Sequence, residues 1–229
     1  MKALLWKDYR LNRMILILGA VLIAGPYVVV ILQQWCRPRH TWSPLVWADL
    51  LGAACQVSLG LSLVTVAILG CNAFAGERAD RSAEFLAYLP PSRRAILMSK
   101  AVLSLVAIAA IWGINLAVAR GVIPALLGDG SPPFNAMPLS KALAVSAAVG
   151  TIMFGMGWGA SAFLESTAIA AGVAFFAPAA VAMAFIGSQH WFGWPTQEEF
   201  GHCYSVVCVA MGTVGFGVGT VHYLRRVEP

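Results

Sequence analysis

Long apolar runs separated by short polar segments dominate this chain. Six runs contain about 20 or more mostly apolar residues, the length that a helix needs to cross the hydrocarbon core of a bilayer. The alternation of apolar and polar residues that is typical of a membrane-spanning strand is absent. The pattern predicts an all-α membrane protein with one domain over residues 1–229, whose spans occupy residues 14–32, 46–74, 96–119, 142–164, 168–187 and 203–224.

Composition agrees with lipid as the solvent of this domain. The chain is 59% hydrophobic and 11% charged, whereas soluble domains average about 45–50% and about 25%. Four basic residues before the first run resemble the start of a signal peptide, namely Lys2, Lys7, Arg10 and Arg13. That run is too long for a signal core and is followed by no small-residue cleavage site. We therefore expect an uncleaved first span.

Basic residues predict the orientation of the spans, because cytoplasmic loops retain Lys and Arg. With a cytoplasmic N-terminus, 11 of the 15 basic residues fall on the inner side, and the other four are Arg37, Arg39, Arg120 and Lys141. The sequence thus predicts a multi-pass protein of the plasma or inner membrane with both termini cytoplasmic. The pI near 9.1 follows from this asymmetry, so we expect the lipid bilayer as a partner and no nucleic acid.

One short segment carries much of the charge. Residues 76–100 contain eight of the 25 charged residues. Residues 74–89 predict a helix with a charged side and an apolar side, which Pro90 and Pro91 end, and Ser92 can cap the next helix. A loop that only fixes topology needs a few basic residues. The added acids and apolar side therefore favour docking of a cytoplasmic partner, with a simple topology loop as the alternative.

A family resemblance is carried by this segment through Glu77, Ser82-Ala83-Glu84-Phe85-Leu86, Leu89-Pro90, Ser92-Arg93-Arg94 and Lys100. The series resembles the cytoplasmic loop of ABC transporter permeases of the type-2 superfamily, where a coupling helix between spans 2 and 3 fits the ATPase subunit. Arg81-Ser82 stands where that family usually has Gly-Thr, and Ser99 replaces a glycine. The resemblance implies that coupling to the ATPase rests on Glu77, Arg81, Glu84, Phe85, Leu86, Arg93 and Arg94.

Two further elements follow from the resemblance. Residues 1–13 are similar to the interfacial elbow helix of these permeases, with Trp6 in the lipid interface and Lys7, Asp8, Arg10 and Arg13 in water. Residues 188–203 match the place of a short outer re-entrant segment before span 6. The His and Glu residues there follow no metal-ligand spacing, so no metal site is expected. Whether Cys36 and Cys203 form a disulfide is left open.

ATP hydrolysis is expected from another polypeptide. A phosphate-binding loop needs a glycine before its lysine, and all four lysines here follow Met, Trp or Ser. We therefore expect no enzyme activity and no cofactor in this chain, with ATP and Mg²⁺ bound by a separate ABC ATPase subunit. The resemblance also implies pairing with a second permease copy, a homodimer or a heteromer.

Polar and small residues within the spans have two interpretations. Gln56, Ser58, Ser62 and Thr65 lie in span 2, and Ala170, Ala174 and Pro178 lie in span 5. Interhelical hydrogen bonds explain the first set. In the similar permeases, however, these two spans face the dimer axis, so the residues are candidates for a transport pathway or a dimer interface.

A repeated motif in the spans is also open to two interpretations. Span 4 and span 6 share the pattern GTxxFGxG, from Gly150 and from Gly212. The repeat is either a coincidence between two glycine-rich helices or a sign that both make tight helix contacts of the same kind.

We expect the membrane subunit of an ABC transporter, an exporter driven by its separate ATPase. The alternatives are an ATP-independent channel or secondary transporter, and an integral membrane enzyme with an outer-face site. Charged residues deep in the spans would favour a channel or secondary transporter, and the sequence has practically none there. An HExxH or GxSxG motif would favour a membrane enzyme, and the sequence contains neither. It does not indicate the substrate or the direction of transport.

Overall fold

The computed structural model describes residues 2–36, 43–79, 92–127, 136–192 and 197–225. Throughout these ranges the regular structure is helical. Six of the helices are long and apolar enough to cross a membrane, which confirms the six predicted spans. They are α1 (Lys2–Trp35), α2 (Pro44–Ala79), α4 (Arg93–Ala117), α6 (Ala136–Phe163), α7 (Thr167–Phe192) and α8 (Gln197–Arg225).

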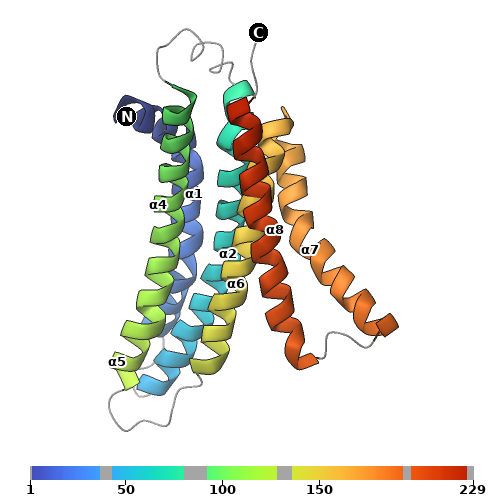
Figure 1. The fold of residues 1–229 in the computed structure, drawn as a ribbon. Helices are drawn as coiled ribbons and strands as arrows, with labels where there is room; N and C mark the ends of the chain where they lie inside the picture. The colour runs from blue at the N-terminus through green and yellow to red at the C-terminus, as the bar shows by residue number, and fades with distance from the viewer. Residues whose placement is uncertain (1, 37–42, 80–91, 128–135, 193–196, 226–229) are drawn as a thin grey trace.

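The six helices run side by side, and the start of α1 and the end of α8 lie at the same end of the bundle (Figure 1). Helices α1 and α4 form one side, α2 and α6 the middle, and α7 and α8 the other side. Helix α4 continues through a π-helical turn, η2 (Val118–Val122), into the short α5 (Ile123–Leu127). Helix α7 diverges from its neighbours toward its C-terminal end (Figure 1).

The predicted elbow is not a separate helix in this structure. Helix α1 is continuous from Lys2 to Trp35 and contains Pro26 without a break. Whether its first turns lie along the membrane surface stays a prediction. The expected coupling helix begins inside α2, and its residues 80–89 lie outside the described residues.

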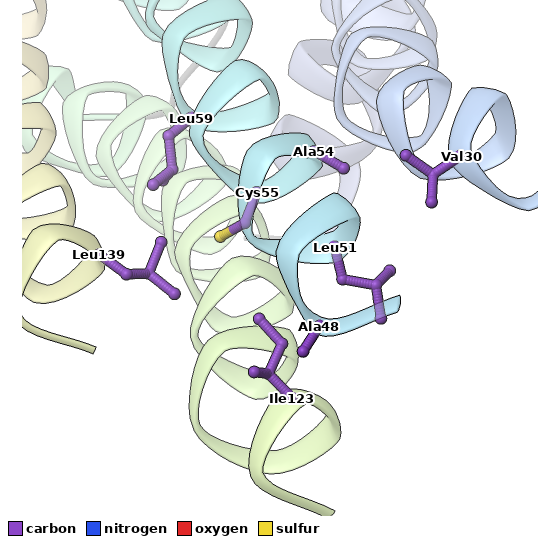
Figure 2. Packing of buried hydrophobic residues seen from close by; sticks show 8 residues of the cluster. All are labelled: Val30, Ala48, Leu51, Ala54, Cys55, Leu59, Ile123 and Leu139. Carbon is purple, nitrogen blue, oxygen red and sulfur yellow. The ribbon is translucent and has the colours of Figure 1, made fainter. Parts of the chain in front are cut away.

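The apolar core follows α2, the most buried of the six spans. At one end of the bundle, α2 contributes Cys55 and Leu59 to a cluster that also includes Val30 of α1, Ile123 of α5 and Leu139 of α6 (Figure 2). Toward the other end, Phe74 of α2 packs edge-on against the fully buried Trp158 of α6, with ring centroids 4.9 Å apart. All five cysteines are free thiols.

The repeated glycine motif forms the contact between α6 and α8. A Cβ atom at Gly155 would lie 1.9 Å from the carbonyl oxygen of Gly212, and one at Gly215 would lie 2.8 Å from that of Gly155. The Trp158 indole donates a hydrogen bond of 3.2 Å to Thr220 Oγ1 across the same contact. The two segments thus share one close contact, but equivalent positions of the repeat do not make contacts of the same kind, because nothing lies within 4 Å of a Cβ at Gly217, the counterpart of Gly155.

We expect Gly155→Leu to lower the free energy of unfolding by roughly 3 kcal/mol or more, because the α8 backbone would have to move away from α6. Gly217→Leu is the matched control, since nothing lies within 4 Å of a Cβ at Gly217 on α8. Denaturant unfolding in detergent measures both variants. Equal stability of the two would contradict the proposed backbone contact.

Candidate functional site

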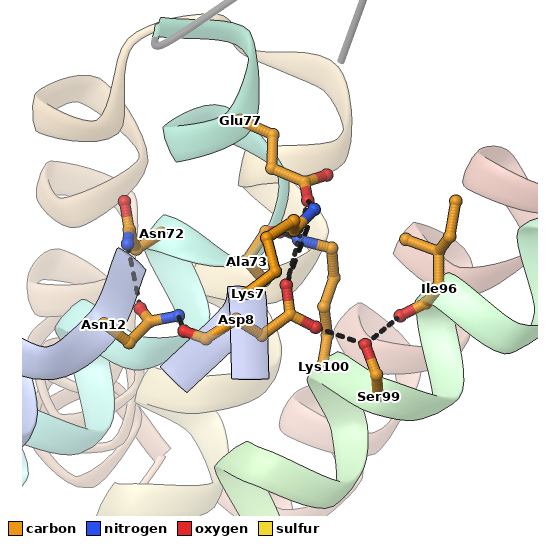
Figure 3. Close-up of polar contacts among 9 residues, drawn as sticks. All are labelled: Lys7, Asp8, Asn12, Asn72, Ala73, Glu77, Ile96, Ser99 and Lys100. Atoms are coloured by element: carbon orange, nitrogen blue, oxygen red, sulfur yellow. Dashed lines mark hydrogen bonds and ion pairs between the residues drawn. The ribbon is translucent and has the colours of Figure 1, made fainter. Parts of the chain in front are cut away.

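Four charged side chains from three helices meet near the end of the bundle that holds the N-terminus (Figure 3). Lys7 and Asp8 come from α1, Glu77 from the last turn of α2, and Lys100 from the second turn of α4. Asp8 is 1% exposed, and Glu77 and Lys100 are each 6% exposed. We refer to these four residues as the charge cluster.

The Glu77 carboxylate is the centre of the charge cluster. Its Oε1 accepts a hydrogen bond from the Lys7 ammonium and lies 3.0 Å from Lys100 Nζ. The Asp8 Oδ1 atom lies 3.7 Å from Lys7 Nζ and 4.0 Å from Lys100 Nζ. Two cations therefore face two anions, and this balance is what allows charged groups to be buried at tolerable cost.

Neutral groups make further contacts with the charge cluster. Ser99 Oγ donates to Asp8 Oδ2, and Lys100 Nζ donates to the carbonyl oxygen of Ala73. The Lys100 ammonium also lies 5.8 Å from the centroid of the Phe74 ring, within cation–π range. These contacts hold the start of α4 against α1 and against the end of α2.

Asparagine side chains link α1 to α2 one turn away. Asn72 Nδ2 donates to Asn12 Oδ1 over 2.9 Å, and Asn12 Nδ2 donates to the carbonyl oxygen of Asp8 over 2.9 Å. A Cβ at Gly76 would lie 2.2 Å from Asn72 Oδ1, so a glycine at that position leaves room for the Asn72 amide. A polar pocket of about 270 Å³ lies beside these groups, and its lining includes Asn12, Asn72, Glu77 and Thr167.

Two more contacts fix the helix ends around this region. The Arg78 guanidinium donates to the carbonyl oxygens of Ala162 at 2.8 Å and Leu164 at 3.4 Å, at the C-terminal end of α6. A cation is favourable there because the last carbonyls of a helix carry partial negative charge. Ser92 caps α4 as predicted, with its hydroxyl accepting from the Ala95 amide at 3.3 Å.

The structure corrects the surroundings of two predicted residues. Asp8 was expected in water and Glu77 on an exposed charged side of a helix, yet both are buried in the charge cluster. The Glu77 carboxylate therefore faces Lys7 and Lys100, and not an exposed docking surface.

The other candidate coupling residues stand as predictions. Arg93 is half-buried and Arg94 exposed in the first turn of α4. Arg81, Glu84, Phe85 and Leu86 lie outside the described residues.

A family model described as an ABC-2 family transporter protein matches residues 49–195, more than half of the 229 residues. The chain belongs to the ABC-2 family of transporter proteins. It is therefore a membrane subunit of the permease type, as the resemblance predicted. A search of curated proteins and a search of solved structures each found no match.

The matched part of this ABC-2 transporter includes Glu77 and Lys100, whereas Lys7 and Asp8 precede it. The charge cluster thus joins the family region to α1. Among the described residues, no group of three or more His, Cys, Asp or Glu side chains is placed to hold a metal ion.

The structure divides the polar residues of span 2 between two sides of α2. Gln56 is exposed, whereas Ser58, Ser62 and Thr65 are buried. Ser58 Oγ donates to the carbonyl oxygen of Ile23 in α1 over 3.2 Å, and Ser62 Oγ donates to that of Leu59 in its own helix. Ser58 therefore makes an interhelical hydrogen bond, as the first of the two interpretations expects.

The span 5 candidates lie inside the ABC-2 transporter chain itself. Ala170 and Ala174 are fully buried against Ala67 and Cys71 of α2 and Met153 of α6. Pro178 is also buried, and its carbonyl oxygen accepts from the Tyr204 hydroxyl of α8 at 3.3 Å. These three residues therefore offer no surface to a second copy in this structure, which corrects that expectation.

Proposed function

We propose that this chain is the membrane subunit of an ABC exporter and that a separate ATPase subunit drives it by docking on segment 80–91. Membership in the ABC-2 transporter family carries the proposal. The charge cluster supports the docking position, because α2 enters segment 80–91 directly after Glu77 and α4 leaves it shortly before Lys100. A force on this segment would therefore act first on the cluster.

The charge cluster would make α1, α2 and α4 respond together. Separating Glu77 from both lysines would break two buried ion pairs, and breaking a buried pair costs about 3–5 kcal/mol. Displacement of α2 and α4 by the docked subunit would thus also move α1. Because α2 packs against α6 at Gly70 and Gly157, and α6 against α8, the helices would shift largely as one body.

A chain that moves as one body needs a second body for alternating access. We propose that a second permease copy supplies it and that α2 faces that copy through the side around Gln56. Gln56 is exposed well inside span 2, where a primary amide facing lipid would lack hydrogen-bond partners. A neighbouring protein surface or an aqueous pathway would satisfy it.

Cross-linking tests the second copy. In a chain with Cys36 and Cys203 changed to serine, Gln56→Cys should give a cross-linked dimer in native membranes, since an axis near α2 places both copies of residue 56 close together. Leu105→Cys is the control because Leu105 is also exposed but lies on a different helix, α4. Failure of Gln56→Cys to cross-link, or equal cross-linking of both, would contradict this arrangement.

Affinity purification of the full chain from its native membranes tests the function as a whole. We expect an ATPase subunit with a phosphate-binding loop to co-purify, and the complex to hydrolyse ATP. A chain that moves a solute in liposomes without any ATPase would instead indicate a channel or secondary transporter. A bound reaction product without an ATPase would indicate a membrane enzyme.

A further inference from the structure

One side of the first turns of α1 is exposed and combines aromatic with basic residues. Its members are Trp6, Tyr9, Arg10 and Arg13. Each lies three or four positions from two of the others, so the four share one side of the helix. Trp6 is 65% exposed, and its ring centroid lies 5.7 Å from that of Tyr9. We refer to these four residues as the basic side of α1.

The exposed residues of α1 change in kind directly after the basic side. From residue 14 onward, large apolar side chains are exposed, namely Met14, Ile17, Leu18 and Val21. Such residues belong in the hydrocarbon core, whereas Trp, Tyr and Arg are typical of the membrane–water interface. The basic side of α1 therefore lies at the level of the lipid headgroups.

Neither arginine of the basic side has an acidic partner among the described residues. The ion pairs of α1 are made by Lys7 and Asp8 instead. Arg10 and Arg13 are exposed, and in the described part of the chain they make no hydrogen bond or ion pair. Residues three apart on a helix have Cβ atoms about 5–6 Å apart. One phosphate group can therefore accept hydrogen bonds from both guanidinium groups.

We propose that the basic side of α1 binds the headgroup of an anionic phospholipid. The lipid phosphate accepts from Arg10 and Arg13, and the acyl chains lie along the apolar side chains that follow. A zwitterionic lipid carries its own cation beside the phosphate, so it gains less from two arginines. An acidic protein surface would also match two arginines, but the exposed Trp6 and the apolar residues after Arg13 favour a lipid. The site is independent of the proposed ATPase docking.

Native mass spectrometry of the full chain, purified in detergent, tests this site. The probes are dioleoyl phosphatidylglycerol and dioleoyl phosphatidylcholine, which share their acyl chains and differ in headgroup charge. The chain should bind its first phosphatidylglycerol more tightly than its first phosphatidylcholine. Arg10→Gln/Arg13→Gln should weaken phosphatidylglycerol binding roughly 20-fold, at about fivefold for each arginine. Phosphatidylcholine binding should change less than about threefold, because that headgroup has no net charge.

Two double variants control this experiment. Arg120→Gln/Lys141→Gln removes the same charge from exposed positions in η2 and α6, at the other end of the bundle (Figure 1), and should bind phosphatidylglycerol like the parent. Arg10→Lys/Arg13→Lys keeps the charge and should keep most of the preference for phosphatidylglycerol. Size-exclusion profiles and thermal unfolding show that each variant is folded.

Two results would overturn the proposal. The first is equal weakening of phosphatidylglycerol binding by the two glutamine double variants, which indicates that net charge attracts the lipid without a site on α1. The second is unchanged lipid binding by Arg10→Gln/Arg13→Gln. If that variant also lost a protein that co-purifies with the parent from native membranes, the two arginines would bind a protein partner.

Discussion

Lys100→Met should lower the free energy of unfolding by about 3–5 kcal/mol, the typical effect of removing one partner from a buried ion pair. The change leaves Lys7 as the one remaining cation of the charge cluster, facing both Asp8 and Glu77. It also removes the hydrogen bond to the Ala73 carbonyl group. Denaturant unfolding of the purified chain in detergent measures the loss.

Two variants control this experiment. Lys141→Met removes an exposed lysine and should change stability by less than about 1 kcal/mol. The double variant Glu77→Gln/Lys100→Met restores charge balance and should lose less than the sum of the two single changes. A Lys100→Met variant as stable as Lys141→Met would show that the charge cluster does not hold the three helices together.

The double variant Glu84→Arg/Phe85→Ala should reduce ATP-driven activity on the order of tenfold or more, because a docking surface would lose both a charge and an apolar anchor. Insertion should be unaffected, since added positive charge agrees with a cytoplasmic location. The measurement is ATP hydrolysis by the reconstituted complex together with the amount of ATPase that co-purifies. If ATP hydrolysis and the amount of co-purified ATPase were both unchanged, segment 80–91 would serve only to fix the membrane topology.

The six spans were predictable because bilayer thickness imposes a length on every apolar helix, and that length is visible in one chain without knowledge of contacts. The burial of the polar residues in span 2 also follows helix geometry. Gln56 and Ser58 are two positions apart, and residues two apart on a helix do not share a side. Helix geometry alone therefore places the exposed Gln56 and the buried Ser58 on different sides of α2.

The charge cluster was harder to predict, because its partners are distant in sequence. Glu77 lies 70 residues from Lys7, and its nearest charged neighbours in the sequence are those of segment 76–100. Because these neighbours are charged, Glu77 was expected on the exposed side of a helix. The available signals were an acid, Asp8, among the basic residues of the N-terminus, and a lysine, Lys100, at the start of an apolar run. A charge in either place is costly unless it is paired.

Photocrosslinking tests the central proposal most directly, namely that an ATPase subunit docks at the end of the bundle that holds the charge cluster. The experiment compares a photocrosslinking residue at position 82 with one at position 130. In native membranes, the probe at Ser82 should capture an ATPase subunit in an amount that changes with added ATP, and the probe at Gly130 should capture none. Capture of the ATPase from Gly130, or labelling of a cysteine at Ser82 by an impermeant reagent outside intact cells, would contradict the proposed orientation and the proposed docking site.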